Sequence, residues 1–313
     1  MPETIKTVAI PGVAWEIAAD IHFPPNFDSK RKYPAVLSAH PIGSCKEQTS
    51  GNVYGKAMAE AGFVVVAFDA SFQGASGGAP RFVENPEFRV SDFRYVVDYI
   101  QTLPYVDPER IGVLGVCGGG GYAFNATMTD YRLKCCVGVT PANFGRISRE
   151  AFGEYDPAGS LEKMAKQRTL EARGAERFVM NYLPSTVDEA NKATTDVDIT
   201  EATEYYKTDR GQTTFGCTSA LFSFNSAALT WDAFGFAEKL MTRPFMAVVG
   251  DRVGGFGAYR DANEIYARAA STEKRLVVLP GVSHYMLYDK PEAVQPALDE
   301  ILPFLSKHLG AAQ

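Results

Sequence analysis

A cysteine stands in the most glycine-rich segment of the chain, Arg110-Ile-Gly-Val-Leu-Gly-Val-Cys-Gly-Gly-Gly-Gly-Tyr122. Cys117 follows an apolar run and precedes a helical pattern, and Gly115-x-Cys117-x-Gly119 has the form Gly-x-Ser-x-Gly with cysteine in the serine position. Glycines flank such strand-to-helix turns because side chains there would collide with neighbouring backbone. The pattern predicts a thiol nucleophile at a helix N-terminus, where free N–H groups favour the thiolate.

An acid and a histidine should follow this nucleophile, each in a loop at the end of a strand. Asp251 comes directly after the apolar run Phe245–Val249, and His284 follows the run Leu276–Leu279. We expect His284 to be the general base and Asp251 to orient it and stabilise its protonated form. The rival carboxylates, Asp232 and Asp289, do not directly follow a core strand.

The other three histidines fit the base less well. His22 adjoins Pro24 and Pro25, and His308 is near the end of the last helical pattern. His40 follows the strand Ala35–Ala39, before the nucleophile, where residues that stabilise an oxyanion are expected. An oxyanion hole needs two backbone N–H donors, and we expect them from Gly118 and Ile42, because Pro41 has no N–H. His40 is predicted to contact the substrate.

These residues need a framework of strands and helices. Trp15–His22 alternates apolar and polar residues, which is typical of an antiparallel strand with one exposed face. The later runs do not alternate, which indicates parallel strands covered on both faces. The alternation of strands and helices predicts an α/β fold with a mostly parallel, doubly wound sheet. Those later strands are Ala35–Ala39, Val64–Asp69, Ile111–Val116, Cys135–Val139, Phe245–Val249 and Leu276–Leu279, and the helical patterns are Gly51–Ala61, Val90–Leu103, Tyr122–Met128, Asp261–Ala270 and Pro291–Leu309.

The alternation stops after Pro141. Residues 143–242 have helical and irregular patterns without a convincing strand, and an insertion this long between core strands is usually functional. We interpret residues 1–142 and 243–313 as the core and 143–242 as a helical cap; a peripheral subdomain or dimerisation arm is the alternative. The aromatic-rich end of the insertion suggests an apolar pocket, with Phe215, Phe222 and Trp231 as candidate substrate contacts. Ordinary packing within the cap explains them equally well.

Composition restricts the partners. A net charge of -6 argues against nucleic acid, and no apolar run is long enough for a membrane span. Five cysteines without a disulfide spacing, and a first segment without an apolar leader, favour the cytoplasm. The vicinal cysteines at 135 and 136 have no ligand-spaced neighbours, so no metal site is expected. We expect no cofactor, a small-molecule acyl substrate and, from the aromatic cap alone, a homodimer.

With these motifs the chain resembles the α/β-hydrolase superfamily, and within it the dienelactone hydrolases and the polyketide-transferase-like esterases and thioesterases. The matching motifs are His40-Pro-Ile-Gly43, Asp69-x-x-x-Gln-Gly-x-Ser-Gly-Gly78, the turn around Cys117, Gly250-Asp251 and Gly281-x-x-His284. They lie in the core and not in the insertion. The resemblance implies an α/β-hydrolase fold and a Cys-His-Asp triad.

The expected activity is cleavage of an ester, thioester or lactone through an acyl-cysteine intermediate. Because that intermediate is itself a thioester, a transferase that passes the acyl group to another nucleophile is an alternative. A binding protein that kept the fold, or a redox-sensing Cys117, are alternatives from other classes.

Overall fold

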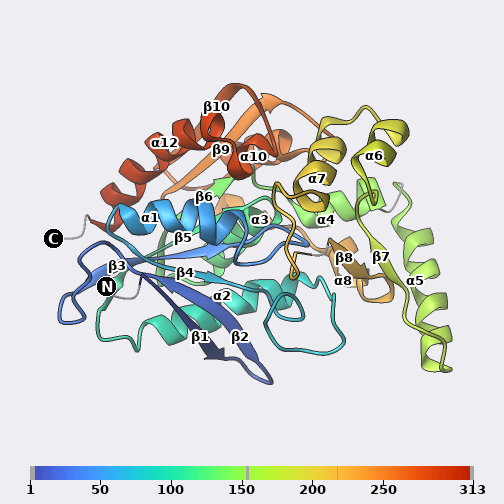
Figure 1. The fold of residues 1–313 in the computed structure, drawn as a ribbon, viewed down its shortest axis with the longest axis horizontal. Coiled ribbons are helices and arrows are strands. Elements are labelled where there is room, and N and C mark those ends of the chain that lie inside the picture. Colours follow the sequence, from blue (N-terminus) through green and yellow to red (C-terminus); the bar gives the residue numbers. More distant parts are fainter. Residues whose placement is uncertain (1–3, 153–154, 217, 311–313) are drawn as a thin grey trace.

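The computed structural model describes residues 4–152, 155–216 and 218–310. An eight-stranded sheet forms its centre (Figure 1). The first strand pairs antiparallel with the second and the second with the fourth, and all other neighbours are parallel. The antiparallel Trp15–His22 strand and the parallel later strands were predicted, whereas the strand at residues 5–11 was not. Across the sheet the strands are β1 (Ile5–Pro11), β2 (Glu16–His22), β4 (Val64–Phe68), β3 (Tyr33–Ala39), β5 (Val106–Val116), β6 (Leu133–Val139), β9 (Phe245–Arg252) and β10 (Lys274–Ser283).

Helices cover both faces of this sheet, so its central strands are buried throughout. Val36 and Val65 pack on one side with η1 (Thr49–Gly55), α1 (Lys56–Glu60), α11 (Met286–Asp289) and α12 (Pro291–Leu309). Leu37 and Val66 point the other way, toward α2 (Pro86–Ile100), α3 (Gly118–Thr129) and α10 (Ala258–Arg268). This is the α/β-hydrolase fold that the motifs indicated.

The segment between β6 and β9, called the insert below, lies to the right of the sheet in Figure 1. Its last part packs into the core, where Phe234, Ala237 and Met241 are fully buried. It contains α4 (Phe144–Ile147), η2 (Ser148–Phe152), α5 (Pro157–Ala172), β7 (Val179–Asn181), α6 (Val187–Ala193), α7 (Val197–Lys207), β8 (Ser219–Leu221), η3 (Phe222–Phe224), α8 (Ser226–Thr230) and α9 (Ala237–Leu240).

Two further features differ from the sequence-based expectation. The insert contains a two-stranded antiparallel sheet of β7 and β8, although no strand was predicted there. Each strand has three residues, which is too short for a recognisable alternation of apolar and polar residues. Paired residues such as Met180 and Ala220 are also far apart in the sequence. In addition, β9 runs beyond Val249 to Arg252, which affects the predicted acid at position 251.

Within the described ranges, no helix combines the length and the apolarity needed to cross a membrane.

Candidate active site

Cys117 lies on a sharp turn between β5 and α3. Its φ of 54° and ψ of -125° are unusual for a residue with a side chain. The glycines around it are required by space: a Cβ on Gly115 would lie 2.2 Å from Gly119 O, and one on Gly119 would lie 2.6 Å from His40 O. The turn therefore has the strained geometry that the Gly-x-Cys-x-Gly pattern predicted.

The two residues predicted to supply oxyanion donors lie beside this turn and against each other. A Cβ on Gly118 would come within 2.4 Å of Ile42 Cδ1, and the Gly118 N–H donates a hydrogen bond to the Cys117 sulfur. Ile42 also lines a pocket that Cys117 enters. The structure thus brings Cys117, Gly118 and the Ile42 side chain together beside this pocket.

His284 is also buried at this end of the sheet, just after β10. Its Nδ1 lies 2.9 Å from Thr140 Oγ1, and its Nε2 lies 3.4 Å from the Tyr288 hydroxyl. The same hydroxyl donates a hydrogen bond to the Cys117 sulfur. Tyr288 therefore connects the thiol to the imidazole, and none of the described hydrogen bonds joins these two groups directly.

Burial decides the charges of the two groups. It raises the pKa of the Cys117 thiol to about 11, although the Tyr288 and Gly118 hydrogen bonds oppose the rise. It lowers the pKa of His284 to about 3. The helix N-terminus was expected to favour a thiolate, but here desolvation outweighs it, so thiol and imidazole are both neutral near pH 7.

Asp251 is not brought to His284. Its side chain is exposed, and its Oδ1 accepts a hydrogen bond of 2.6 Å from the Gly281 N–H. Because β9 continues through Arg252, Asp251 is a strand residue rather than the first residue of a loop. Thr140, which follows β6, occupies the position facing Nδ1 that was expected for Asp251.

Thr140 and Tyr288 were missed by sequence reasoning. Tyr288 follows His284 by four residues, and that spacing is the one signal that could have suggested it. Thr140 gives no signal in the sequence, because its role depends on the neighbouring strands β6 and β9 and on β10 beyond them.

The pocket at Cys117 is small and mostly apolar, with a cavity volume of about 50 Å³. The insert supplies much of its wall, including Phe144, Ile147 and Leu183, and tyrosines 182, 206 and 285 add polar atoms. Phe256, in the loop after β9, closes another side. This lining suits an apolar or aromatic group more than a charged one.

The residues predicted to contact a substrate lie elsewhere. His40 is fully buried: its Nδ1–H donates to Pro41 O (2.6 Å), and its Nε2 accepts from the Ala70 N–H and from Arg89 Nη1 (both 3.0 Å). Burial first, and then the charge of Arg89, hold its pKa well below the usual range. His40 therefore fixes the loop that carries Ile42 and does not line the pocket.

The three predicted aromatic contacts are also outside the pocket lining. Phe215 is 44% exposed, and Phe222 lines a separate cavity inside the insert. Trp231 packs on Tyr122, with ring centroids 5.0 Å apart, at the edge of the core. The aromatic content of the segment predicted an apolar pocket but not which side chains would form it.

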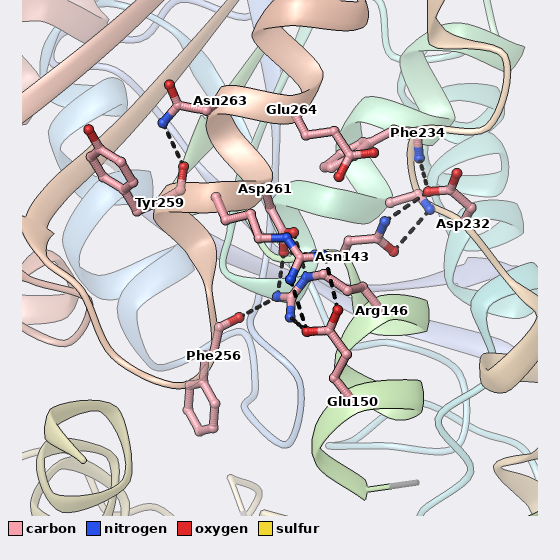
Figure 2. Close-up of polar contacts among 12 residues, drawn as sticks. Asn143, Arg146, Glu150, Asp232, Phe234, Phe256, Tyr259, Asp261, Asn263 and Glu264 are labelled. Carbon is pink, nitrogen blue, oxygen red and sulfur yellow. Dashed lines mark hydrogen bonds and ion pairs between the residues drawn. The ribbon is translucent and has the colours of Figure 1, made fainter. Parts of the chain in front are cut away.

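A buried ion-pair network holds the start of the insert against α10 (Figure 2). Arg146 Nε and Nη2 donate to the two oxygens of Asp261 at 2.6 and 2.8 Å, and Nη1 donates to Glu150 at 2.9 Å. Arg146 Nη2 also donates to Phe256 O, and the Asn143 N–H donates to Asp261. The network thus fixes both α4 and the loop of Phe256, which are two walls of the pocket.

The other cysteines that the structure describes are buried away from Cys117's pocket lining. Cys45, Cys135 and Cys136 are buried free thiols, and burial raises the pKa of Cys45 to about 12. The fifth, Cys217, lies outside the described residues. Among the residues that the structure describes, no three His, Cys, Asp or Glu side chains group as metal ligands would.

Comparison with known proteins places the chain in a family. A family model described as serine aminopeptidase, S33, matches residues 43–291. The Escherichia coli (strain K12) protein YcjY is 37% identical over 297 residues, which are 94% of each chain. The Pseudomonas aeruginosa protein PA2218 is 34% identical over 305 residues, covering 94% of this chain and 77% of that protein.

Two further comparisons concern structure and a shorter match. The crystal structure of PA2218 superposes with a TM-score of 0.86 at 29% identity, over 97% of this chain and 94% of that one. A thiohydrolase of Arthrinium phaeospermum, apmlB, is 33% identical over 127 residues, or 39% of each chain. Since the family model covers most of the chain and the sheet has the matching fold, the protein is an enzyme of the α/β-hydrolase class and belongs to the serine aminopeptidase S33 family.

Proposed function

We propose that this enzyme cleaves an ester, thioester or lactone through an acyl intermediate on Cys117, with His284 as general base. The observation that carries the proposal is the position of Cys117. It lies on a strained turn at a helix N-terminus, lines an apolar pocket, and is linked by one tyrosine hydroxyl to a buried histidine. A cysteine nucleophile in this fold resembles the dienelactone hydrolases named above.

Acylation begins from a neutral thiol. As Sγ attacks the carbonyl carbon, its proton passes to His284 Nε2, either directly or through the Tyr288 hydroxyl that contacts both groups. The N–H groups of Gly118 and Ile42 stabilise the negative oxygen of the tetrahedral intermediate. When the intermediate collapses, the bond to the leaving group breaks, and the leaving group takes the proton from His284.

Deacylation repeats these steps with water. Water gives a proton to His284 Nε2 and attacks the thioester carbon; the carbon–sulfur bond then breaks, and Cys117 regains the proton. Thiol and imidazole are neutral at the start and at the end, in agreement with the direction in which burial moves both pKa values.

The substrate is proposed to carry an apolar or aromatic acyl group. The lining by Phe144, Ile147 and Leu183 supports this, and the similarity over part of the chain to a thiohydrolase supports a thioester as the scissile group. Transfer to an amine or thiol is the second candidate, because the acyl-cysteine is a thioester and the pocket around it is mostly apolar.

The test uses p-nitrophenyl butyrate and the butyryl thioester of N-acetylcysteamine as probes. We expect Cys117→Ala to lower the rate of cleavage by more than about 10³-fold, because the covalent route is lost. Cys45→Ala removes a buried thiol that hydrogen-bonds Thr213 instead, so its rate should stay near wild type. Equal loss in both variants, or none in Cys117→Ala, would reject Cys117 as the nucleophile.

The same assay separates the two candidates. Added hydroxylamine or a small thiol competes with water for the acyl-enzyme, so the ratio of acylated acceptor to free acid measures the preference. A ratio that exceeds the acceptor's advantage in the uncatalysed reaction indicates a transferase, and a ratio at or below it indicates a hydrolase.

A further inference from the structure

A buried aspartate of the insert lies close to His284. Asp198, in the first turn of α7, is 2% exposed. Its Oδ2 accepts a hydrogen bond of 2.9 Å from the Phe256 N–H, whereas its Oδ1 has no partner among the described residues. A buried carboxylate oxygen without a hydrogen-bond partner destabilises the folded state, so its presence here calls for a functional explanation.

Oδ1 has a polar cavity beside it. Asp198, Thr140 and His284 line one small cavity together with Gly250 and Arg252 of β9. Thr140 Oγ1 faces His284 Nδ1 at 2.9 Å and makes no other hydrogen bond among the described residues. If Nδ1–H donates to Oγ1, the Thr140 hydroxyl proton is left to be donated, and Asp198 supplies an acceptor on the same cavity.

The loop after β9 is shaped to admit this carboxylate. A Cβ on Gly254 would lie 2.3 Å from Asp198 Cγ, so only glycine leaves room for it there. The acid predicted for this end of the sheet was Asp251, which is exposed and bonded to Gly281 instead. A carboxylate from another segment thus stands at the end of β9, and in chain order it also lies between Cys117 and His284.

We propose that Asp198 is the carboxylate that stabilises the His284 imidazolium during acyl transfer, acting through the Thr140 hydroxyl. The inference rests on the proposed function. Nδ1–H donates to Thr140 Oγ1, and the Thr140 O–H donates to Asp198 Oδ1 directly or through one water in the cavity. No proton is transferred to Asp198, whose negative charge offsets the positive charge that forms on the ring. Asp198 is therefore a positioning residue.

The surroundings of Asp198 give this role a pH signature. Burial raises its pKa to about 7, the Phe256 N–H opposes the rise, and Asp196, the N-cap of α7, and Glu201 of α7 add to it. From β9, Arg252 lines the cavity and lies 3.4 Å from Glu201, and Tyr259 lines it from α10. A protonated Asp198 cannot offset the imidazolium charge, so the rate of acylation should increase as pH rises through about 7. His284 adds no such step there, because its own pKa is near 3.

The experiment compares Asp198→Asn with Asp251→Asn on p-nitrophenyl butyrate between pH 5.5 and 9. The amide side chain of Asp198→Asn keeps an oxygen to accept from the Phe256 N–H, so the fold is preserved while the charge is lost. We expect the acylation rate of Asp198→Asn at pH 8 to fall by roughly 10²-fold with the rise near pH 7 abolished. Asp251→Asn should stay within about threefold of wild type, with its pH profile unchanged.

A second variant keeps the test decisive if Asp198→Asn folds poorly. Thr140→Val has the same shape and removes the connecting hydroxyl, so it should also slow acylation and flatten the pH profile. In the double variant the two losses should not add, because they break one connection. Thermal unfolding at pH 8 checks each fold.

Failure of the inference and failure of the proposed function give different results. If wild type forms no acyl adduct on Cys117, the proposed function fails. If wild type forms the adduct and Asp198→Asn acylates at the same rate with the same pH profile, Asp198 has no role in the reaction. If Asp251→Asn instead lowers the acylation rate strongly, Asp251 and not Asp198 is the carboxylate that stabilises the His284 imidazolium.

Discussion

At the residue scale, the site depends on a thiol that the fold holds in its uncharged form. Burial keeps the pKa of Cys117 near 11 and that of His284 near 3, so the pair does not exist as ions before the substrate binds. The base acts only as the sulfur attacks. A thiol in this state should react slowly with ordinary alkylating agents and faster with acyl groups that the pocket binds.

The Tyr288 hydroxyl contacts both the Cys117 thiol and the His284 imidazole. In Tyr288→Phe we expect acylation to slow by roughly tenfold, because a hydrogen bond to sulfur and a contact with Nε2 are both lost. The ring still packs, so unfolding should change little. Stopped-flow measurement of p-nitrophenol release checks this.

Tyr54→Phe is the matched control for Tyr288→Phe. Tyr54 is buried in the same cluster, but its hydroxyl donates to Leu287 O at 2.8 Å and not to Cys117. Its substitution should lower stability slightly and leave the acylation rate unchanged. Equal rates in Tyr288→Phe and wild type would show that the proton moves without this hydroxyl.

Sequence reasoning reached part of this site. Cys117, Gly118 and Ile42 lie together because glycine spacing and strand ends are local properties that the sequence expresses. Asp251 was chosen on the assumption that β9 ends at Val249; backbone pairing with β10 carries it further, and such pairing is not visible in one sequence.

At the element scale, the insert is part of the site and not merely a cover. It supplies walls of the pocket, and α7 brings Asp198 to the cavity at His284. The mostly parallel sheet of the core could be predicted from the alternation of apolar runs and helices. The position of the insert could not, because it depends on buried charges whose partners are more than a hundred residues apart, such as Arg146 and Asp261.

The Arg146–Asp261 pair should be essential for docking the insert. Arg146→Met leaves the Asp261 carboxylate buried without its counter-ion, so we expect a loss of about 3 kcal/mol in the free energy of unfolding. The double variant with Asp261→Asn should recover part of this loss, because no uncompensated charge remains. Urea unfolding measures both.

Arg132→Met is the control for this ion pair. Arg132 bonds Asp98 and Asp130 near the surface and is 35% exposed, so its loss should cost less than about 1 kcal/mol. If Arg146→Met is no more destabilising than Arg132→Met, the buried pair does not hold the insert in place.

At the scale of the whole molecule, buried ionisable groups determine how stability varies with pH. Burial raises the pKa of Asp69 to about 6 and those of Asp92 and Asp198 to about 7. The folded state therefore binds more protons than the unfolded state between about pH 4 and just above pH 7. The contribution of these carboxyl groups to the free energy of unfolding is therefore largest below about pH 4. It is lost as the pH rises through 6 and 7.

The buried histidines act in the opposite direction. Burial lowers the pKa values of His40 and His284, so between about pH 3 and 6.5 the unfolded state takes up the protons. Stability then increases with pH up to about 6.5. The two effects offset one another below that pH, and only the carboxyl effect remains above it.

We therefore expect the midpoint of thermal unfolding to change little between about pH 5 and 6 and to fall toward pH 8. Asp198→Asn removes one buried charge and should reduce this fall, so the variant is more stable than wild type at pH 8 while it is less active. Calorimetry from pH 5 to 9 tests both statements. A midpoint that still rises from pH 6 to 8, or a less stable Asp198→Asn at pH 8, would contradict them.

The most direct test of the central claim is the mass of the intact protein after brief exposure to the butyryl thioester of N-acetylcysteamine. We predict one butyryl group on wild type, located on Cys117, which disappears as the reagent is consumed. His284→Ala should acquire and lose it far more slowly, and Cys117→Ala should never carry it. An adduct on another residue, or turnover by Cys117→Ala at the wild-type rate, would contradict the acyl-cysteine mechanism.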